Sequence, residues 1–182
     1  MTLLARWNQQ INLTSLDVVT PSDDAIDRLI VEPLAAAEHV LPHARLAIDV
    51  GSGGGSPAIP MKLARPALKF LLVESKARKA AFLREVVRHL SLTDVQVEAK
   101  RVEDLLTVSK PREKADLITV RGVRIGTAFL TLLGSALHRE GRIFWFAGRA
   151  APEVDSQLFR AAKKRILIAR SRAQLIELEL VN

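Results

Sequence analysis

Short apolar runs alternate with longer amphipathic segments along most of this chain. Five of the runs have the length of a buried strand, and they lie at 45–50, 68–74, 95–99, 115–120 and 141–146. The clearest helix between them is expected over 76–90, where apolar residues recur at helical spacing. Its apolar stripe consists of Leu83, Val86, Val87 and Leu90. Strands that alternate with helices are typical of a mostly parallel sheet, so the pattern predicts a three-layer α/β fold.

The two ends of the chain depart from this rhythm. Near the carboxyl end, "KRILIARS" and "AQLIELELVN" are strand-like runs joined by only a residue or two, too short for a crossover helix, so they predict an antiparallel hairpin. In the second run Ile176, Leu178 and Leu180 alternate with Glu177 and Glu179, which predicts one buried and one exposed face. The first forty residues are predicted to be helical, with a helix end near "NLTS" at 12–15 and a new start at "PSDD", 21–24.

Composition limits the function classes that need to be considered. At 182 residues and 48% hydrophobic content, the chain is long enough for one domain with its own core. It contains neither an apolar run of about 20 residues nor the features of a signal peptide, so we expect a cytoplasmic protein. The absence of cysteine excludes disulfides and thiolate catalysis, and the four histidines show no metal-binding spacing. A net charge of +7 shifts the expectation modestly toward an anionic partner.

A glycine-rich loop, "DVGSGGGSPAIP" at 49–60, follows the first predicted strand. Because Gly51, Gly53 and Gly55 lack a Cβ, the chain can turn tightly here and a ligand can approach its backbone. Glu74, at the end of the second predicted strand, is placed to accept hydrogen bonds from two ribose hydroxyls. Both features predict a nucleotide-like ligand, and both fit either a nicotinamide dinucleotide or S-adenosylmethionine.

Three details favour S-adenosylmethionine. The dinucleotide fingerprint has glycine or alanine at its sixth position, but counting from Gly51 that position is Ser56. Asp49 places a carboxylate where a pyrophosphate would be repelled and a cationic ammonium or sulfonium would be attracted. The predicted terminal hairpin is the third detail, since by fold-level analogy methyltransferase folds close with an antiparallel strand pair whereas dinucleotide folds continue with further βα units.

Four segments resemble a known family in their order and spacing. They are "RWNQQINLTS", "DVGSGGGSPAIP", "LLVESKARKAAFLREVVRHLSL" and "KRVEDL". Over about 4–148 the chain is similar to the bacterial small-subunit ribosomal RNA guanine-N7 methyltransferases, the RsmG or GidB family. The resemblance implies a class I S-adenosylmethionine-dependent methyltransferase fold, which is Rossmann-like, and methylation of a guanine in 16S rRNA or the small ribosomal subunit. We therefore expect one methyltransferase domain over 1–182, with a helical cap over 1–44 and a Rossmann-like core over 45–182.

The resemblance also implies roles for individual residues. Gly51 and Ser56 would border the methionine and ribose part of the cofactor, and Val102 and Glu103 would flank its adenine. Arg121, just after the fourth predicted strand, would reach the cofactor or the incoming RNA and is the candidate catalytic residue. Guanine N7 carries an unprotonated lone pair at neutral pH, so the reaction needs alignment rather than a general base.

Several positions depart from the family pattern. Leu29 stands where a histidine is expected, Glu32 and Pro33 stand where Asp-Ser is expected, and Ala147-Gly148 replaces Lys-Gly. Ser56 replaces a bulky apolar residue, and Arg121 is followed by Gly122 rather than alanine. These departures fall on the substrate side more than on the cofactor side. They leave two alternatives open: a cofactor-binding module of the same fold without rRNA methylation, and a methyltransferase for a small molecule.

The aromatic and basic residues outside these motifs have plain interpretations. Trp7 and Trp145 are expected to be core residues, because neither lies among interleaved basic residues. The basic side chains of the helix expected over 76–90 are first of all a solvated face, and an RNA-contacting strip is the second hypothesis. They are Lys76, Arg78, Lys79, Arg84 and Arg88.

Overall fold

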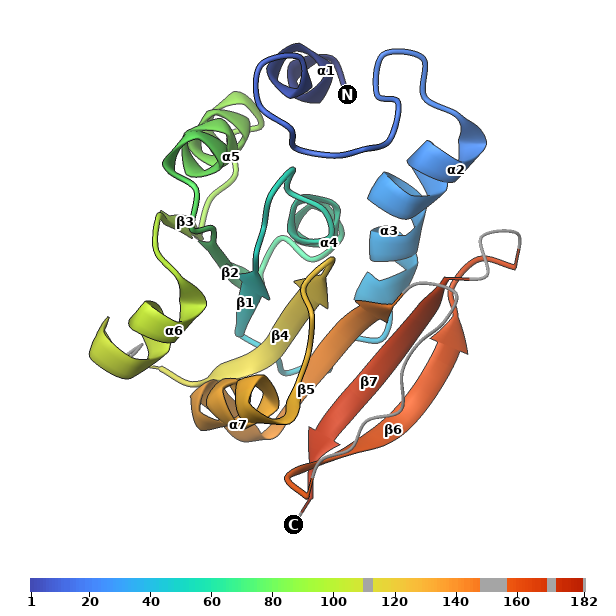
Figure 1. Ribbon diagram of the computed structural model, residues 1–182. Helices are drawn as coiled ribbons and strands as arrows, with labels where there is room; N and C mark the ends of the chain where they lie inside the picture. Colours follow the sequence, from blue (N-terminus) through green and yellow to red (C-terminus); the bar gives the residue numbers. More distant parts are fainter. Residues whose placement is uncertain (110–112, 148–156, 170–172, 182) are drawn as a thin grey trace.

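The computed structural model describes residues 1–109, 113–147, 157–169 and 173–181, and its centre is a seven-stranded sheet (Figure 1). The strand order is β3-β2-β1-β4-β5-β7-β6. The strands are β1 (Leu46–Val50), β2 (Lys69–Val73), β3 (Val95–Glu98), β4 (Ala115–Arg121), β5 (Leu137–Ala147), β6 (Phe159–Ile166) and β7 (Gln174–Leu180). The first five strands are parallel, β7 is antiparallel to β5, and β6 is antiparallel to β7. The predicted mostly parallel sheet with a terminal hairpin is confirmed.

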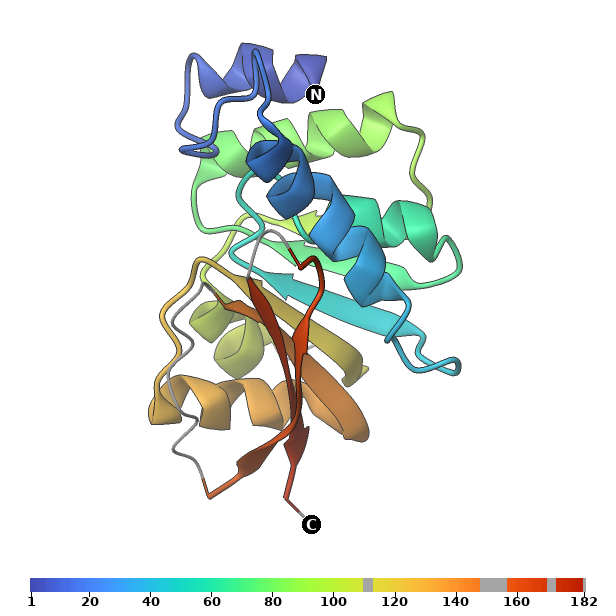
Figure 2. The same cartoon turned by 90° about the vertical axis from the view of Figure 1, so that its right-hand side faces the viewer.

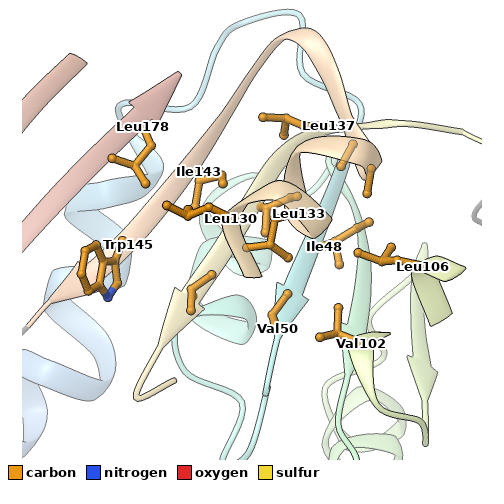
Figure 3. Close-up of a cluster of buried hydrophobic side chains, with 14 of the residues drawn as sticks. Ile48, Val50, Val102, Leu106, Leu130, Leu133, Leu137, Ile143, Trp145 and Leu178 are labelled. Atoms are coloured by element: carbon orange, nitrogen blue, oxygen red, sulfur yellow. The ribbon is translucent and has the colours of Figure 1, made fainter. Parts of the chain in front are cut away.

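Two apolar clusters cover the two faces of this sheet. On one face α6 (Val102–Asp104), the π-helix η2 (Leu105–Ser109) and α7 (Thr127–Ala136) pack on the strands, and Figure 3 shows part of this cluster around Ile48, Leu133 and Trp145. On the other face lie α3 (Glu32–Ala37), α4 (Ala58–Ala64) and α5 (Ala77–His89). The turned view shows these layers edge-on, with α7 on the opposite side from α4 and α5 (Figure 2). Burial on both faces explains why the central strands are continuously apolar.

The helix α5 confirms the helix expected over 76–90, but one part of its predicted stripe is wrong. Leu83 and Val86 are buried as expected, together with Ala80 and Phe82. Leu90 is 42% exposed, because it follows the last turn of the helix as its C-cap and so leaves the buried stripe.

In the amino-terminal segment the predicted helix start at 21–24 is confirmed, but the predicted helix end at 12–15 is wrong because the first helix already ends at Asn8. The first, α1 (Thr2–Asn8), ends where the side-chain oxygen of Asn8 accepts the backbone N–H groups of Leu13 and Thr14, at 2.8 and 3.0 Å. A continuous helical stretch then runs through α2 (Asp23–Ile26), the π-helix η1 (Asp27–Val31) and α3. The hydroxyl of Ser22 caps its start by accepting the N–H of Ala25 at 3.2 Å.

Both tryptophans pack on the core, although to different depths. Trp145 in β5 is 8% exposed, which confirms its prediction. Trp7 is half-buried: its ring centroid lies 5.8 Å from that of Phe82, and its indole N–H donates to Glu85 at 2.9 Å. Since Phe82 and Glu85 belong to α5, these contacts fix α1 against that helix.

The carboxyl-terminal hairpin differs from the prediction in two details. The strands β6 and β7 are separated by 167–173 rather than by a residue or two, because the ladder ends at the pairing of Ile166 with Gln174. Leu167 leaves the ladder and packs against the second apolar cluster. Glu177 was expected on an exposed face, but it is fully buried because Arg142 and Arg165 both pair with its carboxylate.

The predicted division of the chain into a cap and a core is not tested by the structure, but the possibility of a membrane-spanning helix is. The division into a cap over 1–44 and a core over 45–182, working as one methyltransferase domain, stays a prediction. Within the described ranges, no helix has the length and apolarity that crossing a membrane requires.

Candidate functional site

The glycine loop leaves the carboxyl end of β1 and leads into α4. Its backbone has positive φ at three positions, 71° at Gly51, 48° at Gly53 and 87° at Gly55. A Cβ at Gly51 would also lie 2.9 Å from a methyl group of Val123, and one at Gly55 would lie 2.9 Å from the Ile59 side chain. Other residues would be strained in this conformation and crowded by these neighbours, so the predicted tight turn is confirmed.

A cavity of about 300 Å³ opens beside this loop, at the carboxyl ends of the parallel strands. Residues 51–54 and Ser56 form one wall, and residues 13–16, which include the last three of "NLTS", contribute another. Four charged residues line the cavity from different elements: Arg28 from η1, Glu74 just after β2, Lys79 from α5 and Arg121 from the end of β4. Its volume lies in the range of ligand sites, and its place at the sheet edge is the usual one for α/β folds.

Glu74 connects the second strand to the glycine loop. Its carboxylate accepts the backbone N–H of Gly53 at 3.0 Å with one oxygen and that of Lys76 at 2.8 Å with the other. The residue is 6% exposed and lines the cavity. Because each carboxylate oxygen can accept more than one hydrogen bond, both keep capacity for a ligand hydroxyl.

Asp49 lies beneath the loop and does not line the cavity. The Thr119 hydroxyl donates to its Oδ1 at 2.6 Å, whereas its Oδ2 is buried and has no partner among the described residues. Burial raises the pKa of Asp49 to about 6, and the hydrogen bond from Thr119 and the charge of Arg121 only partly oppose this shift. A carboxyl group with one orphaned oxygen therefore sits under the turn, poised to change its charge near neutral pH.

Arg121 uses its guanidinium to join four parts of the site. Its Nη2 donates to Glu32 at 2.8 Å, and its Nη1 donates to the Ser56 hydroxyl at 3.2 Å and to the backbone carbonyl of Arg28. The group stacks on the Phe146 ring, 4.4 Å from its centroid. Burial lowers the pKa of Arg121 to about 10, while the charge of Glu32 works in the opposite direction. Arg121 thus holds η1, α3 and the glycine loop on the end of β4.

Two of the positions that depart from the family pattern, Glu32 and Ser56, contact this arginine, and Leu29 contacts Ser56. Glu32 keeps a carboxylate where the family pattern has aspartate; it is 2% exposed, and its Oε1 is buried with no partner in the described part of the chain. Leu29 lines the cavity, and its carbonyl accepts the Ser56 hydroxyl at 2.9 Å. Ala147 is buried at the end of β5, and Gly148 lies outside the described residues.

Two further predicted residues lie at the same sheet edge but do not line the cavity. Val102 opens α6, just beyond the end of β3, and packs in the same apolar cluster as Val73. Glu103 follows it and is exposed. The sequence analysis did not identify Arg28 as a site residue. The one feature that could have pointed to it is its position next to Leu29, which departs from the family pattern.

A second cavity of about 400 Å³ lies on the other side of the loop, between α1, α4 and α5. Its lining is mostly apolar and includes Leu34, Ile59, Phe82 and Leu90. The two cavities share Leu4, Leu29, Gly54 and Ser56. Gly55 lines this second cavity rather than the first.

Comparison with known proteins identifies the family. The family model GidB, described as rRNA small subunit methyltransferase G, matches residues 1–173. The chain belongs to the GidB family. The ribosomal RNA small subunit methyltransferase G of Roseiflexus castenholzii is 36% identical and aligns over 98% of this chain and 73% of its own length. The protein of the same name from Chromobacterium violaceum is 35% identical and aligns over 78% of this chain and 64% of its own length.

Solved structures confirm the predicted class I methyltransferase fold of this GidB-family chain. A crystal structure of an MtNAS mutant in complex with S-adenosylmethionine has a TM-score of 0.67 at 15% identity, over all of this chain and 73% of that one. A putative methyltransferase, yhhF, from Escherichia coli has a TM-score of 0.65 at 16% identity, over 92% of each chain. At such low identities these likenesses concern the fold.

Proposed function

We propose that this GidB-family chain is an S-adenosylmethionine-dependent methyltransferase that methylates N7 of a guanine in 16S rRNA, with the small ribosomal subunit as its substrate and the cytoplasm as its place of action. The observation that carries the proposal is that the family match over 1–173 includes a cavity lined by the glycine loop, Glu74 and Arg121. The test is transfer of a labelled methyl group to 16S rRNA.

The residues present fit the proposed cofactor. S-adenosylmethionine carries an ammonium group, a sulfonium group and a ribose diol, and bound in this site it would supply an electrophilic methyl group. The spare acceptor capacity of Glu74 matches the ribose hydroxyls, and the carboxyl group of Asp49, beneath the loop, would attract the cationic groups through space. Both carboxylates would repel a pyrophosphate. We propose that the cofactor is held by Asp49, Gly51, Gly53, Gly55, Ser56, Glu74, Val102, Glu103 and Arg121.

Charge compensation around Arg121 suits the proposed reaction. Methylation at N7 leaves a positive charge on the guanine ring, so an uncompensated cation beside the base would oppose it. The ion pair with Glu32, at 2.8 Å, offsets the charge of Arg121 within the protein. We propose that Arg121 serves catalysis through the position of η1 and Ser56 around the incoming base, a role that alignment-limited chemistry requires.

Replacing Glu74 by alanine is expected to weaken binding of S-adenosylmethionine by about 1 to 3 kcal/mol, because the ribose hydroxyls lose their acceptor and Gly53 loses its partner. Calorimetric titration measures the change. Glu98→Ala is the matched control, since Glu98 ends the neighbouring strand β3 but does not line the cavity. Nicotinamide dinucleotide should give no heat with any of these proteins. Equal cofactor affinity in the unmodified chain and Glu74→Ala would remove Glu74 from the site.

A further inference from the structure

Arg28, unlike Arg121, has a side chain with no partner among the residues that the structure describes. Its side chain is exposed and lines the cavity, and it makes no hydrogen bond or ion pair to any residue that the structure describes. The guanidinium of Arg121, in contrast, donates hydrogen bonds to Glu32, Ser56 and a backbone carbonyl. Arg28 therefore keeps all of its guanidinium donors for a ligand.

The backbone that carries Arg28 is nevertheless held in place. Its carbonyl accepts Nη1 of Arg121, and the carbonyl of the next residue, Leu29, accepts the Ser56 hydroxyl at 2.9 Å. Both carbonyls belong to the π-helix η1, a type of turn that occurs frequently at functional sites. The guanidinium of Arg28 is thus free, while the backbone beside it is held by two hydrogen bonds. This lowers the entropic cost of ordering the Arg28 side chain around a ligand.

The balance of charge at the cavity favours an oxyanion near Arg28. Among the charged residues that line it, Arg28, Lys79 and Arg121 are cationic and Glu74 is the acidic one. The buried carboxylate of Glu32 offsets Arg121, and the charge of Arg28 lies close enough to disfavour the charged form of Arg121. An anionic ligand at Arg28 would compensate this excess.

We infer that Arg28 binds a backbone phosphate of the RNA next to the target guanine, an inference that rests on the proposed function. A guanidinium can engage two phosphate oxygens at once, which fixes orientation as well as charge. Arg28 is the exposed member of the arginine pair, on the side of the cavity that the N-terminal helices form. Phosphate contacts of this kind set the register of a nucleic acid while other groups read the base. Phosphate bound to Arg28 would also neutralise the remaining free guanidinium near the reacting ring.

The test is the salt dependence of binding to a 16S rRNA fragment. Arg28→Gln should weaken binding about three- to tenfold at moderate salt and reduce the slope of log affinity against log salt by about 1, the signature of one lost phosphate contact. Arg28→Lys should keep the slope, because the charge is retained. Arg139→Gln is the matched control, since Arg139 is exposed near the amino end of β5, away from the cavity. It should keep both affinity and slope.

Calorimetry with S-adenosylmethionine separates the possible sources of the oxyanion. Arg28→Gln should bind the cofactor as the unmodified chain does, and the variant keeps the backbone carbonyl that Arg121 contacts. Weaker cofactor binding with an unchanged RNA slope would overturn the inference and point to the carboxylate of the cofactor. An unchanged slope with unchanged cofactor affinity would also overturn it and leave Arg28 as a solvated side chain. Absence of RNA binding by the unmodified chain would instead overturn the proposed function, and this inference with it.

Discussion

Asp49→Asn is expected to stabilise the protein at pH 7.5 by up to about 3 kcal/mol and to weaken its binding of S-adenosylmethionine. Burial raises the pKa of Asp49 from 3.8 to about 6, so between these pH values the folded state holds a proton that the unfolded chain has lost, and above about 6 the folded state must bury a charge. The stability from this group is therefore complete below pH 3.8 and is lost as the pH rises through about 6. At about 1.36 kcal/mol per pKa unit, the loss approaches 3 kcal/mol, and asparagine avoids it because it does not ionise.

Urea unfolding at two pH values measures this effect. The gain of Asp49→Asn should shrink to about 1 kcal/mol at pH 4.5, where Asp49 is protonated in the folded protein. Asp116→Asn is the control, because the half-buried carboxylate of Asp116 accepts the backbone N–H groups of Arg45 and Leu46. That variant should lose stability rather than gain it. A loss of stability in Asp49→Asn at pH 7.5 would show that burial of the ionised Asp49 carboxylate does not destabilise the folded protein.

The same group makes cofactor binding dependent on pH. The cationic groups of S-adenosylmethionine should bind best to the ionised form of Asp49, so affinity in the unmodified chain should fall about tenfold from its high-pH value by pH 5, one unit below a pKa of about 6. In Asp49→Asn the affinity should be low and independent of pH over this range. A flat profile in the unmodified chain would place the cofactor away from Asp49.

Glu177→Ala is expected to lower the free energy of unfolding by about 3 to 5 kcal/mol, the range found when one partner is removed from a buried ion pair. The Glu177 carboxylate is fully buried between two arginines, with Arg142 Nη1 at 3.0 Å from Oε2 and Arg165 Nε on Oε1. Without it, two partly buried arginine side chains, 28% and 30% exposed, lose their counter-charge. Since Arg142 belongs to β5 and Arg165 to β6, the substitution should loosen the attachment of the hairpin to the sheet.

Glu179→Ala on the same strand is the matched control. Its carboxylate pairs with Arg160 at 2.6 Å, but the two side chains are 26% and 69% exposed, so the loss should stay below about 1 kcal/mol. Urea unfolding of both variants compares them directly. Equal losses in the two variants would show that the buried cluster contributes no more than an exposed ion pair.

The mostly parallel sheet and the glycine turn could be predicted because their signals are local, whereas the strand order came only from the structure. Continuous apolar runs of strand length, separated by amphipathic helices, indicate a parallel sheet buried on both faces. Asp49 lies near the end of β1, and the glycines and Glu74 follow the ends of β1 and β2; such ends meet at one edge of a parallel sheet. The positive φ values of the loop were implied by the glycines themselves.

The arrangement around Arg121 has no local signal. Its partners Ser56, Glu32 and Arg28 are 65, 89 and 93 positions away in the sequence, and only the folded chain brings them together. The burial of Glu177 was missed for a related reason, because an acidic residue in an alternating strand indicates an exposed face unless distant arginines cover it. The free guanidinium of Arg28 could be recognised only in the folded structure, where Arg121 pairs with Glu32 and Ser56 and the side chain of Arg28 does not.

The proposed methylation of 16S rRNA is measured directly by transfer of tritiated methyl groups from labelled S-adenosylmethionine to small ribosomal subunits from a strain that lacks its own enzyme for this modification. We expect the unmodified chain to label 16S rRNA at N7 of one guanine, and subunits from a strain that already carries the modification to accept no label. If calorimetry shows cofactor binding but neither kind of subunit is labelled, the methyltransferase proposal for rRNA is contradicted, and a cofactor-binding module or a small-molecule methyltransferase takes its place.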